Sequence, residues 1–204
     1  MQITEIRTDE TLRELRAHGT PEFPFEYYYD DFNKFSGQSI AWHWHREFEF
    51  VAVDAGPIDC LIGAERLRME IGSGLFINSG AIHRFESTAQ GRMPNILFAP
   101  EFLAERDSLV FRQHILPVLN AGCRFIPLTR GTDAGDAVLH RLRRIFETAQ
   151  SDSPLRTLDL KAESCALWSA LAAHAGERFC ETRSAENAVL QSRLQSMIRF
   201  IETH

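Results

Sequence analysis

The sequence predicts a mainly β domain over residues 1–100, followed by a helical segment over residues 101–204. Before residue 100, short apolar runs alternate with glycine-containing turns about 8 to 12 residues apart, which is typical of a β-sandwich or β-barrel. After residue 100, apolar residues recur at three- and four-residue spacing, the period of an amphipathic helix. The length of 204 residues suits one large domain or two small ones.

Four strands are predicted between residues 60 and 87. Residues 60–69 indicate two strands joined by a tight turn at Gly63, and residues 74–87 indicate two more, broken at Asn78-Ser79-Gly80. Upstream, the three tyrosines at 27–29 belong either to an N-terminal arm that closes over a ligand or to an edge strand with one packed face. We favour the edge strand.

Two long helices are predicted in the second half. The first spans residues 133–150, where one apolar stripe contains Val138, Leu139, Leu142, Ile145 and Phe146. The second begins at Ser153-Pro154, because serine caps a helix well and proline is preferred at the first helical position. Gly176 is expected to end it.

The second helix has two apolar stripes, one of them made of Leu155, Leu158, Ala162, Cys165 and Trp168. The other contains Leu160, Leu167 and Leu171, and we expect these three leucines to form a homodimer interface, because a helix with two apolar faces is buried on both. A last helix is predicted from Ser184. It is still running at His204, so we expect the chain to be the truncated front part of a longer protein.

The net charge of −6 argues against nucleic-acid binding by this chain itself, since such binding needs a basic face. The four cysteines form no C-x-x-C pair, which indicates a reducing compartment, and we expect Cys123 and Cys165 to be small core residues. No stretch has the composition of a signal peptide or of a membrane span. The sequence therefore predicts a soluble, cytoplasmic protein.

The stretch "HWHREFE" at residues 43–49 carries the candidate chemistry. Alternate residues of a regular strand share a face, so His43, His45 and Glu49 are expected to lie together. The opposite face would be aromatic and packed in the core, with Trp42, Trp44, Phe48 and Phe50. A further imidazole, His83, follows the turn at residues 78–80.

Three imidazoles and one carboxylate suit a divalent transition metal such as Zn²⁺, Ni²⁺, Fe²⁺ or Mn²⁺. The alternative is a metal-free, hydrogen-bonded polar cluster inside a barrel. In either case these groups would line a barrel mouth where a small effector binds. The residues that we expect to touch such a ligand are Glu47, Val51 and Phe85.

These residues resemble the motifs of the cupin superfamily. The first cupin motif is matched at every spacing, by Gly37, His43, His45, Glu49 and Gly56. The second is matched in part, by Gly72, Gly80 and His83, and it departs at Asn78, where proline is usual, and at Ser87, where asparagine is usual. The resemblance implies a cupin-like double-stranded β-helix, that is, a jelly-roll barrel. It also implies that the metal ligands are His43, His45, Glu49 and His83.

A narrower resemblance covers about residues 21 to 204. The order and spacing of several segments look like the N-terminal sensing half of AraC-type transcriptional regulators: "EFPFEYYYDDF", "HWHREFEFVAVDAG", "GLFINSGAIHRF", "PNILFAPEFL" and "SRLQSMIRFIETH". In that family a cupin-like barrel and a helical dimerisation segment precede a helix-turn-helix DNA-binding domain. Residues 1–100 would then be the barrel with its N-terminal arm, and residues 101–204 the dimerisation segment and linker.

Two functions are compatible with these residues. The first is an effector-sensing and dimerisation module that binds a small molecule and contacts DNA only through an absent C-terminal domain. The second is a metal-dependent cupin enzyme, a dioxygenase or an isomerase. We favour the regulator over the enzyme, because a long helical tail that ends in mid-helix suits a dimerisation segment.

Overall fold

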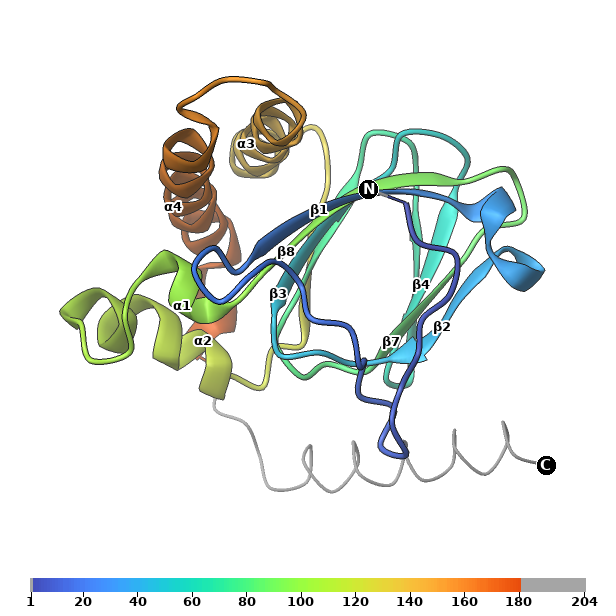
Figure 1. Cartoon of the computed structure of the whole chain (residues 1–204), viewed down its shortest axis with the longest axis horizontal. Coiled ribbons are helices and arrows are strands. Elements are labelled where there is room, and N and C mark those ends of the chain that lie inside the picture. Colours follow the sequence, from blue (N-terminus) through green and yellow to red (C-terminus); the bar gives the residue numbers. More distant parts are fainter. Residues whose placement is uncertain (1, 181–204) are drawn as a thin grey trace.

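The computed structural model describes residues 2–180 and shows two antiparallel β-sheets that face each other, with the helices on one side (Figure 1). The strand orders are β1-β8-β3-β6-β9 in the first sheet and β2-β7-β4-β5 in the second. The strands are β1 (Phe25–Asp31), β2 (Ser39–His43), β3 (Phe48–Ala52), β4 (Ile58–Ile62), β5 (Glu65–Met69), β6 (Gly74–Ile77), β7 (His83–Glu86), β8 (Arg92–Phe98) and β9 (Phe125–Leu128). The predicted fold class, a cupin-like jelly-roll barrel followed by a helical segment, is confirmed.

The predicted strand breaks are correct. Gly63 joins β4 and β5 with a φ of 59°, a left-handed conformation that glycine adopts without strain. Residues 78–80 separate β6 from β7, but these two strands lie in different sheets and do not form a hairpin. The tyrosines at 27–29 lie in β1, an edge strand of the first sheet, as favoured.

The two departures from the cupin motif have structural roles. Asn78 is buried, and its side-chain amide donates to the backbone carbonyls of Val118 (2.8 Å) and Cys123 (2.9 Å), which ties the sheet to the segment before β9. The Ser87 hydroxyl donates to the carbonyl of Pro57 and accepts from the amide of Gly91. Each residue therefore satisfies backbone groups of neighbouring loops.

The prediction of one regular strand across residues 43–49 is wrong. β2 ends at His43 and β3 begins at Phe48, so the stretch crosses from the second sheet to the first. The polar residues still converge, because the barrel-facing sides of the two sheets point at each other. In β3 the alternation holds: Glu49 and Val51 face the barrel, while Phe48 and Phe50 pack under the helices, and all four are buried.

The aromatic residues of this stretch do not form one wall. Phe48 stacks on Trp168 of the helical segment with ring centroids 4.6 Å apart. Trp42 and Trp44 are half-buried and pack instead against Leu12 of the N-terminal segment and Ile82. The two tryptophans have different neighbours from Phe48 because the chain crosses from the second sheet to the first between them.

The helical segment covers the outer face of the first sheet (Figure 1). Its helices are α1 (Pro100–Leu103), α2 (Leu116–Asn120), α3 (Asp133–Ala149) and α4 (Arg156–Ala175), with short helical turns at Phe32–Lys34, Ser36–Gln38, Phe111–Ile115 and Gly176–Cys180. The apolar stripe predicted for α3 is buried at all five positions. β9 follows residue 100 yet pairs with β6, so the second half of the chain also adds a strand to the barrel.

The structure buries the face of α4 that was predicted to meet a partner subunit. Leu160, Leu167 and Leu171 are at most 4% exposed and lie in the core between the sheet and the helices, so the prediction that they face a partner subunit is wrong. The exposed leucines are Leu155 and Leu158, at 57% and 64%. The period of a helix reveals its apolar faces but not which of them the rest of the chain covers.

Several smaller predictions can also be compared with the structure. Cys165 is exposed and Cys123 is half-buried, so neither is the core residue we expected. α4 ends before Gly176, which has a φ of 54°, as predicted. The last predicted helix, from Ser184, lies outside the described residues. Among the described helices, none is long and apolar enough to cross a membrane.

Candidate functional site

Three histidines from separate segments meet inside the barrel. His43 ends β2, His45 lies in the crossing between the sheets, and His83 begins β7, where it pairs with His43 across the strands. Their possible metal-binding atoms all lie within 4.8 Å of one another. All three side chains are buried, at 4% exposure or less.

Each imidazole is oriented by the backbone of its own segment. The Nδ1 atom points at a carbonyl oxygen two residues away: that of Ala41 for His43 (2.8 Å), Ala81 for His83 (2.9 Å) and Glu47 for His45 (3.2 Å). A carbonyl can only accept, so Nδ1 carries the proton and Nε2 keeps its lone pair. This is the arrangement by which proteins hold metal-binding histidines in one tautomer.

The carboxylate of Glu49 lies beside the three rings. Its Oε2 atom is 3.1 Å from Nε2 of His83 and 3.4 Å from Nε2 of His45. Among the described residues, Nε2 of His83 is nevertheless a buried nitrogen with no hydrogen bond. A buried polar atom without a partner is costly, and a metal ion at this position would satisfy it.

The protonation states of two of these groups, His43 and Glu49, favour a cation. Burial lowers the pKa of His43 to about 3, helped by its two histidine neighbours, so this ring is neutral near pH 7. Burial alone would raise the pKa of Glu49, but His45 and His83 hold it below its ordinary value. Burial alone would lower the pKa of His83, and the adjacent Glu49 carboxylate raises it instead. A neutral imidazole and an ionised carboxylate are the forms that bind metals, so His43 and Glu49 are ready to bind, and any proton that His83 holds would be released on binding.

The residues present therefore fit a divalent transition ion. Three imidazole nitrogens and one carboxylate oxygen suit Zn²⁺, Ni²⁺, Fe²⁺ and Mn²⁺ alike, so the donor set does not select among them. The structure brings together all four residues that the motif spacing implied.

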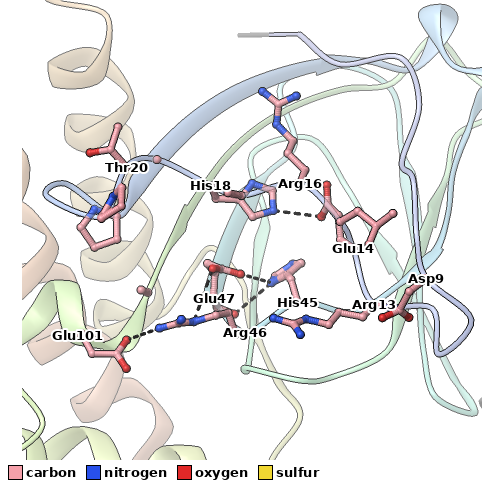
Figure 2. A pocket seen from close by; sticks show the side chains of 16 residues that line it. Asp9, Arg13, Glu14, Arg16, His18, Thr20, His45, Arg46, Glu47 and Glu101 are labelled. Atoms are coloured by element: carbon pink, nitrogen blue, oxygen red, sulfur yellow. Dashed lines mark hydrogen bonds and ion pairs between the residues drawn. The ribbon is translucent and has the colours of Figure 1, made fainter.

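A cavity of about 550 Å³ opens next to the triad. Figure 2 shows the N-terminal segment along one wall, with Glu14, Arg16 and His18, and residues 45–47 along the facing wall. Arg46 is held there by an ion pair of 2.9 Å with Glu101. We call this space the outer cavity.

A second space of about 20 Å³ lies deeper in the barrel, enough for one water molecule. We call it the inner cavity, and its lining includes His43, Glu49 and Phe85. Of the three residues predicted to touch a ligand, Glu47 lines the outer cavity and Phe85 the inner one. Val51 lines neither of these two spaces and is fully buried in the apolar core of the barrel.

Sequence reasoning missed Asp30, a buried carboxylate on the wall of the inner cavity. Oδ2 accepts a hydrogen bond of 2.7 Å from Asn95, while Oδ1 has no hydrogen-bond partner among the described residues. Burial raises the pKa of Asp30 to about 7, and the Glu49 charge adds to the rise. Strand parity offers a signal: if Tyr28 faces the barrel, so does Asp30 two residues later.

Two residues of the N-terminal segment were also missed. Glu14 and His18 lie over the triad, with His18 Nε2 3.1 Å from Glu14 Oε2 and both side chains 2% exposed. The His18 ring meets the His45 ring edge-on, with centroids 5.6 Å apart. Nothing local in the sequence predicts this, because the segment reaches the site only through tertiary contacts.

Comparison with known proteins gives matches of two kinds. The sequence model of the AraC-like ligand binding domain family matches residues 31–204. A protein of Bacillus subtilis (strain 168) described as the uncharacterized HTH-type transcriptional regulator YdeC is 24% identical over 199 residues, which are 96% of this chain and 67% of that protein.

Solved structures match more weakly. The conserved SPY1581 protein of Streptococcus pyogenes gives a TM-score of 0.33 at 21% identity, over 38% of this chain and 64% of that one. An RmlC-like cupin of Shewanella frigidimarina NCIMB 400 gives 0.31 at 15% identity, over 37% and 64%. The aligned parts therefore span less than two thirds of either structure.

Proposed function

Because this chain belongs to the family of AraC-like ligand binding domains, we propose that its barrel senses a small-molecule effector for a transcriptional regulator. The family match confirms the resemblance that the motifs indicated. The observation that carries the proposal is the outer cavity. Its volume of about 550 Å³ is that of a small-molecule site, and it opens beside the triad.

We place the effector between the N-terminal segment and residues 45–47, in contact with Glu47 and next to His45. An effector that binds one arrangement of this segment better than another shifts the population toward that arrangement. That shift is what a regulator passes on to the rest of the protein. We propose that the contact with DNA is made by a helix-turn-helix domain outside residues 1–204, and that the protein acts in the cytoplasm.

We further propose that a divalent metal ion is part of the sensor, held by His43, His45, His83 and Glu49. Such an ion would supply a Lewis-acid contact for an oxygen or nitrogen atom of the effector. The same residues would serve the alternative, a metal-dependent enzyme. Membership of a ligand-binding family, together with the regulator from Bacillus, favours a sensor over an enzyme.

Filling the outer cavity is expected to abolish effector binding. Ala17 is exposed and lines this cavity, so Ala17→Trp places an indole where the effector would lie. Thermal unfolding of the purified chain with a library of metabolites should first reveal a stabilising compound. At 100 times Kd a ligand adds about 2.7 kcal/mol to the free energy of unfolding.

Ala17→Trp should lose this gain, whereas Ala137→Trp, on the exposed side of α3, should keep it. An unchanged gain in the Ala17→Trp variant would place the effector outside this cavity.

We propose that two copies of the chain associate through the exposed stripe of α4. Leu158, Ala162 and Cys165 follow one another on this face and are all exposed. Cys165 lies at the middle of α4, which spans Arg156–Ala175. In an interface with twofold symmetry, a residue on the axis meets its own copy, so the two Cys165 side chains would be close.

Mild oxidation is expected to join two chains through Cys165. The product should be a disulfide-linked dimer on a non-reducing gel, and Cys165→Ser should prevent it. Leu158→Glu should yield a monomer in sedimentation, because a charge in an apolar interface is costly. Leu109→Glu, at a leucine that is 60% exposed outside α4, should leave the dimer intact. A monomeric wild-type chain at micromolar concentration would contradict the proposal.

A further inference from the structure

A further open cavity lies outside the barrel, between the first sheet and the C-terminal end of α3. Its volume is about 450 Å³, which is within the range of small-molecule sites. We call it the accessory cavity, and its lining is Gln2, Tyr27, Tyr29, Asp31, Lys34, Arg92, Ala149 and Gln150. None of these residues lines the outer or the inner cavity, so this space is not part of the barrel interior.

Two tyrosines of β1 line the accessory cavity side by side. Tyr27 and Tyr29 alternate with Tyr28, so they lie on the opposite face of the strand from it. Tyr28 is buried and lines the inner cavity, whereas Tyr27 packs against Phe146 of α3 with ring centroids 5.6 Å apart. Tyr27 and Tyr29 are half-buried, so part of each side chain is open to a ligand in the accessory cavity.

Two exposed cations, Lys34 and Arg92, also line this cavity. Arg92 donates a hydrogen bond to the Tyr29 hydroxyl, a neutral oxygen, and this hydroxyl donates in turn to Asp54. Within the described part of the chain, neither Lys34 nor Arg92 forms an ion pair with a carboxylate. Both positive charges are therefore available to a ligand.

Asp31 is the one carboxylate among the described residues of this lining. Its Oδ1 atom accepts hydrogen bonds from the backbone amide of Asn33 (3.1 Å) and from the side chain of Asn33 (2.8 Å). These bonds lower the pKa of Asp31, and the nearby charges of Arg92 and Lys34 lower it further. Two positive charges thus face a single negative charge that is already hydrogen-bonded, which leaves the lining with a surplus positive charge.

We propose that the accessory cavity binds a small organic anion. Lys34 and Arg92 would hold its carboxylate or phosphate group, because hydrogen bonds between ionised partners are the strong ones. Its apolar part would lie against Tyr27 and Tyr29, since aromatic rings offer a large apolar surface. The cavity joins β1 and β8 to the end of α3, so the anion would contact the barrel and the helical segment at once (Figure 1). This site depends on neither the proposed effector site nor the proposed metal site.

The three tyrosines of the sequence allow a direct test, because all three lie in β1. Protein labelled with 3-fluorotyrosine gives three fluorine NMR signals, which single Tyr→Phe variants assign. The probes are phenyl phosphate, phenylacetate and the uncharged phenylacetamide, each added in the presence of a chelator. We expect at least one of the two anions to shift the signals of Tyr27 and Tyr29 saturably, with Tyr28 unchanged. Phenylacetamide should shift none of them.

Two variants test the role of the cations. Lys34→Gln and Arg92→Gln should each weaken binding of the anionic probe by about 10-fold or more, in keeping with the loss of a hydrogen bond between charged groups. Arg143→Gln changes an exposed cation of α3 that does not line the cavity, and it should bind the probe like the wild type.

Three results would overturn the proposal. The first is that neither anion shifts Tyr27 or Tyr29 at millimolar concentration, including the case in which only the signal of Tyr28, the reporter of the barrel interior, moves. The second is that phenylacetamide binds as well as the anions. The third is that both cation variants keep the wild-type affinity.

Discussion

Replacing His83 with alanine is expected to lower the affinity for a divalent metal ion by more than about 100-fold, because loss of an outer partner alone costs about 10- to 100-fold. His83 is fully buried, and its Nε2 atom has no hydrogen bond among the described residues. The variant removes this nitrogen and also one of the groups that keep Glu49 ionised. Elemental analysis of protein purified without a histidine tag, followed by titration of the stripped protein, measures the effect.

Two further variants make the His83 experiment specific. His45→Ala removes a ligand that lies in the crossing segment rather than in a strand, and it should lose metal to a similar degree. His140→Ala, at an exposed position of α3, should retain wild-type affinity. If the triple-imidazole site is only a hydrogen-bonded cluster, all three proteins and the wild type will lack stoichiometric metal.

Replacing Asp30 with asparagine is expected to stabilise the protein at pH 8 and to leave its stability almost unchanged at pH 4. Burial raises the pKa of this carboxyl from 3.8 to about 7. Between those two pH values the folded protein holds a proton that the unfolded chain has released, so stability falls as the pH rises through this window. Below it both states are protonated, and above it the fall is complete.

The asparagine side chain does not ionise, so the variant avoids the fall. With about 1.36 kcal/mol for each unit of pKa, the difference in the free energy of unfolding at pH 8 reaches up to about 4 kcal/mol. Asn95 keeps an oxygen to which it can donate. The measurement is urea unfolding of both proteins from pH 4 to pH 8 in the presence of a chelator.

The comparison between variants isolates Asp30, because the histidines and Glu49 titrate in both proteins. Asp31→Asn serves as the control, since Asp31 is on the same strand and the hydrogen bonds from Asn33 lower its pKa. That variant should not gain stability between pH 4 and pH 8. A constant difference between Asp30→Asn and the wild type over the whole range would show that Asp30 holds no proton in the fold.

Local patterns predicted the elements well, because turns and helices depend on neighbouring residues. The turn at Gly63 needs only a residue that tolerates positive φ, and the stripe of α3 needs only the helical period. The candidate metal site was also within reach of the sequence, since the motif spacing around His43 and His83 implied it. Its geometry depended on pairing between strands, which the spacing does not describe.

Contacts between distant segments decided what the sequence left open. One apolar face of α4 looked free for a partner, and the structure covers Leu167 with the chain's own sheet. The sequence analysis did not single out Asp30, and in the structure β1 places it, buried, on the wall of the inner cavity. A sequence pattern shows which residues share one face of a helix or strand. Which segment packs against that face depends on the packing of the whole chain.

The sequence by itself determined a β-barrel followed by helices, and it determined which four side chains could bind a metal. Tertiary structure decided that β2 and β3 lie in different sheets. Residues 43–49 therefore connect the two sheets and do not form one strand. It also decided that the N-terminal segment, whose local pattern gives no sign of the site, lies over the triad with Glu14 and His18. The physical reason is that periodicity records local backbone geometry, whereas burial and hydrogen bonding between segments are settled only when the chain packs.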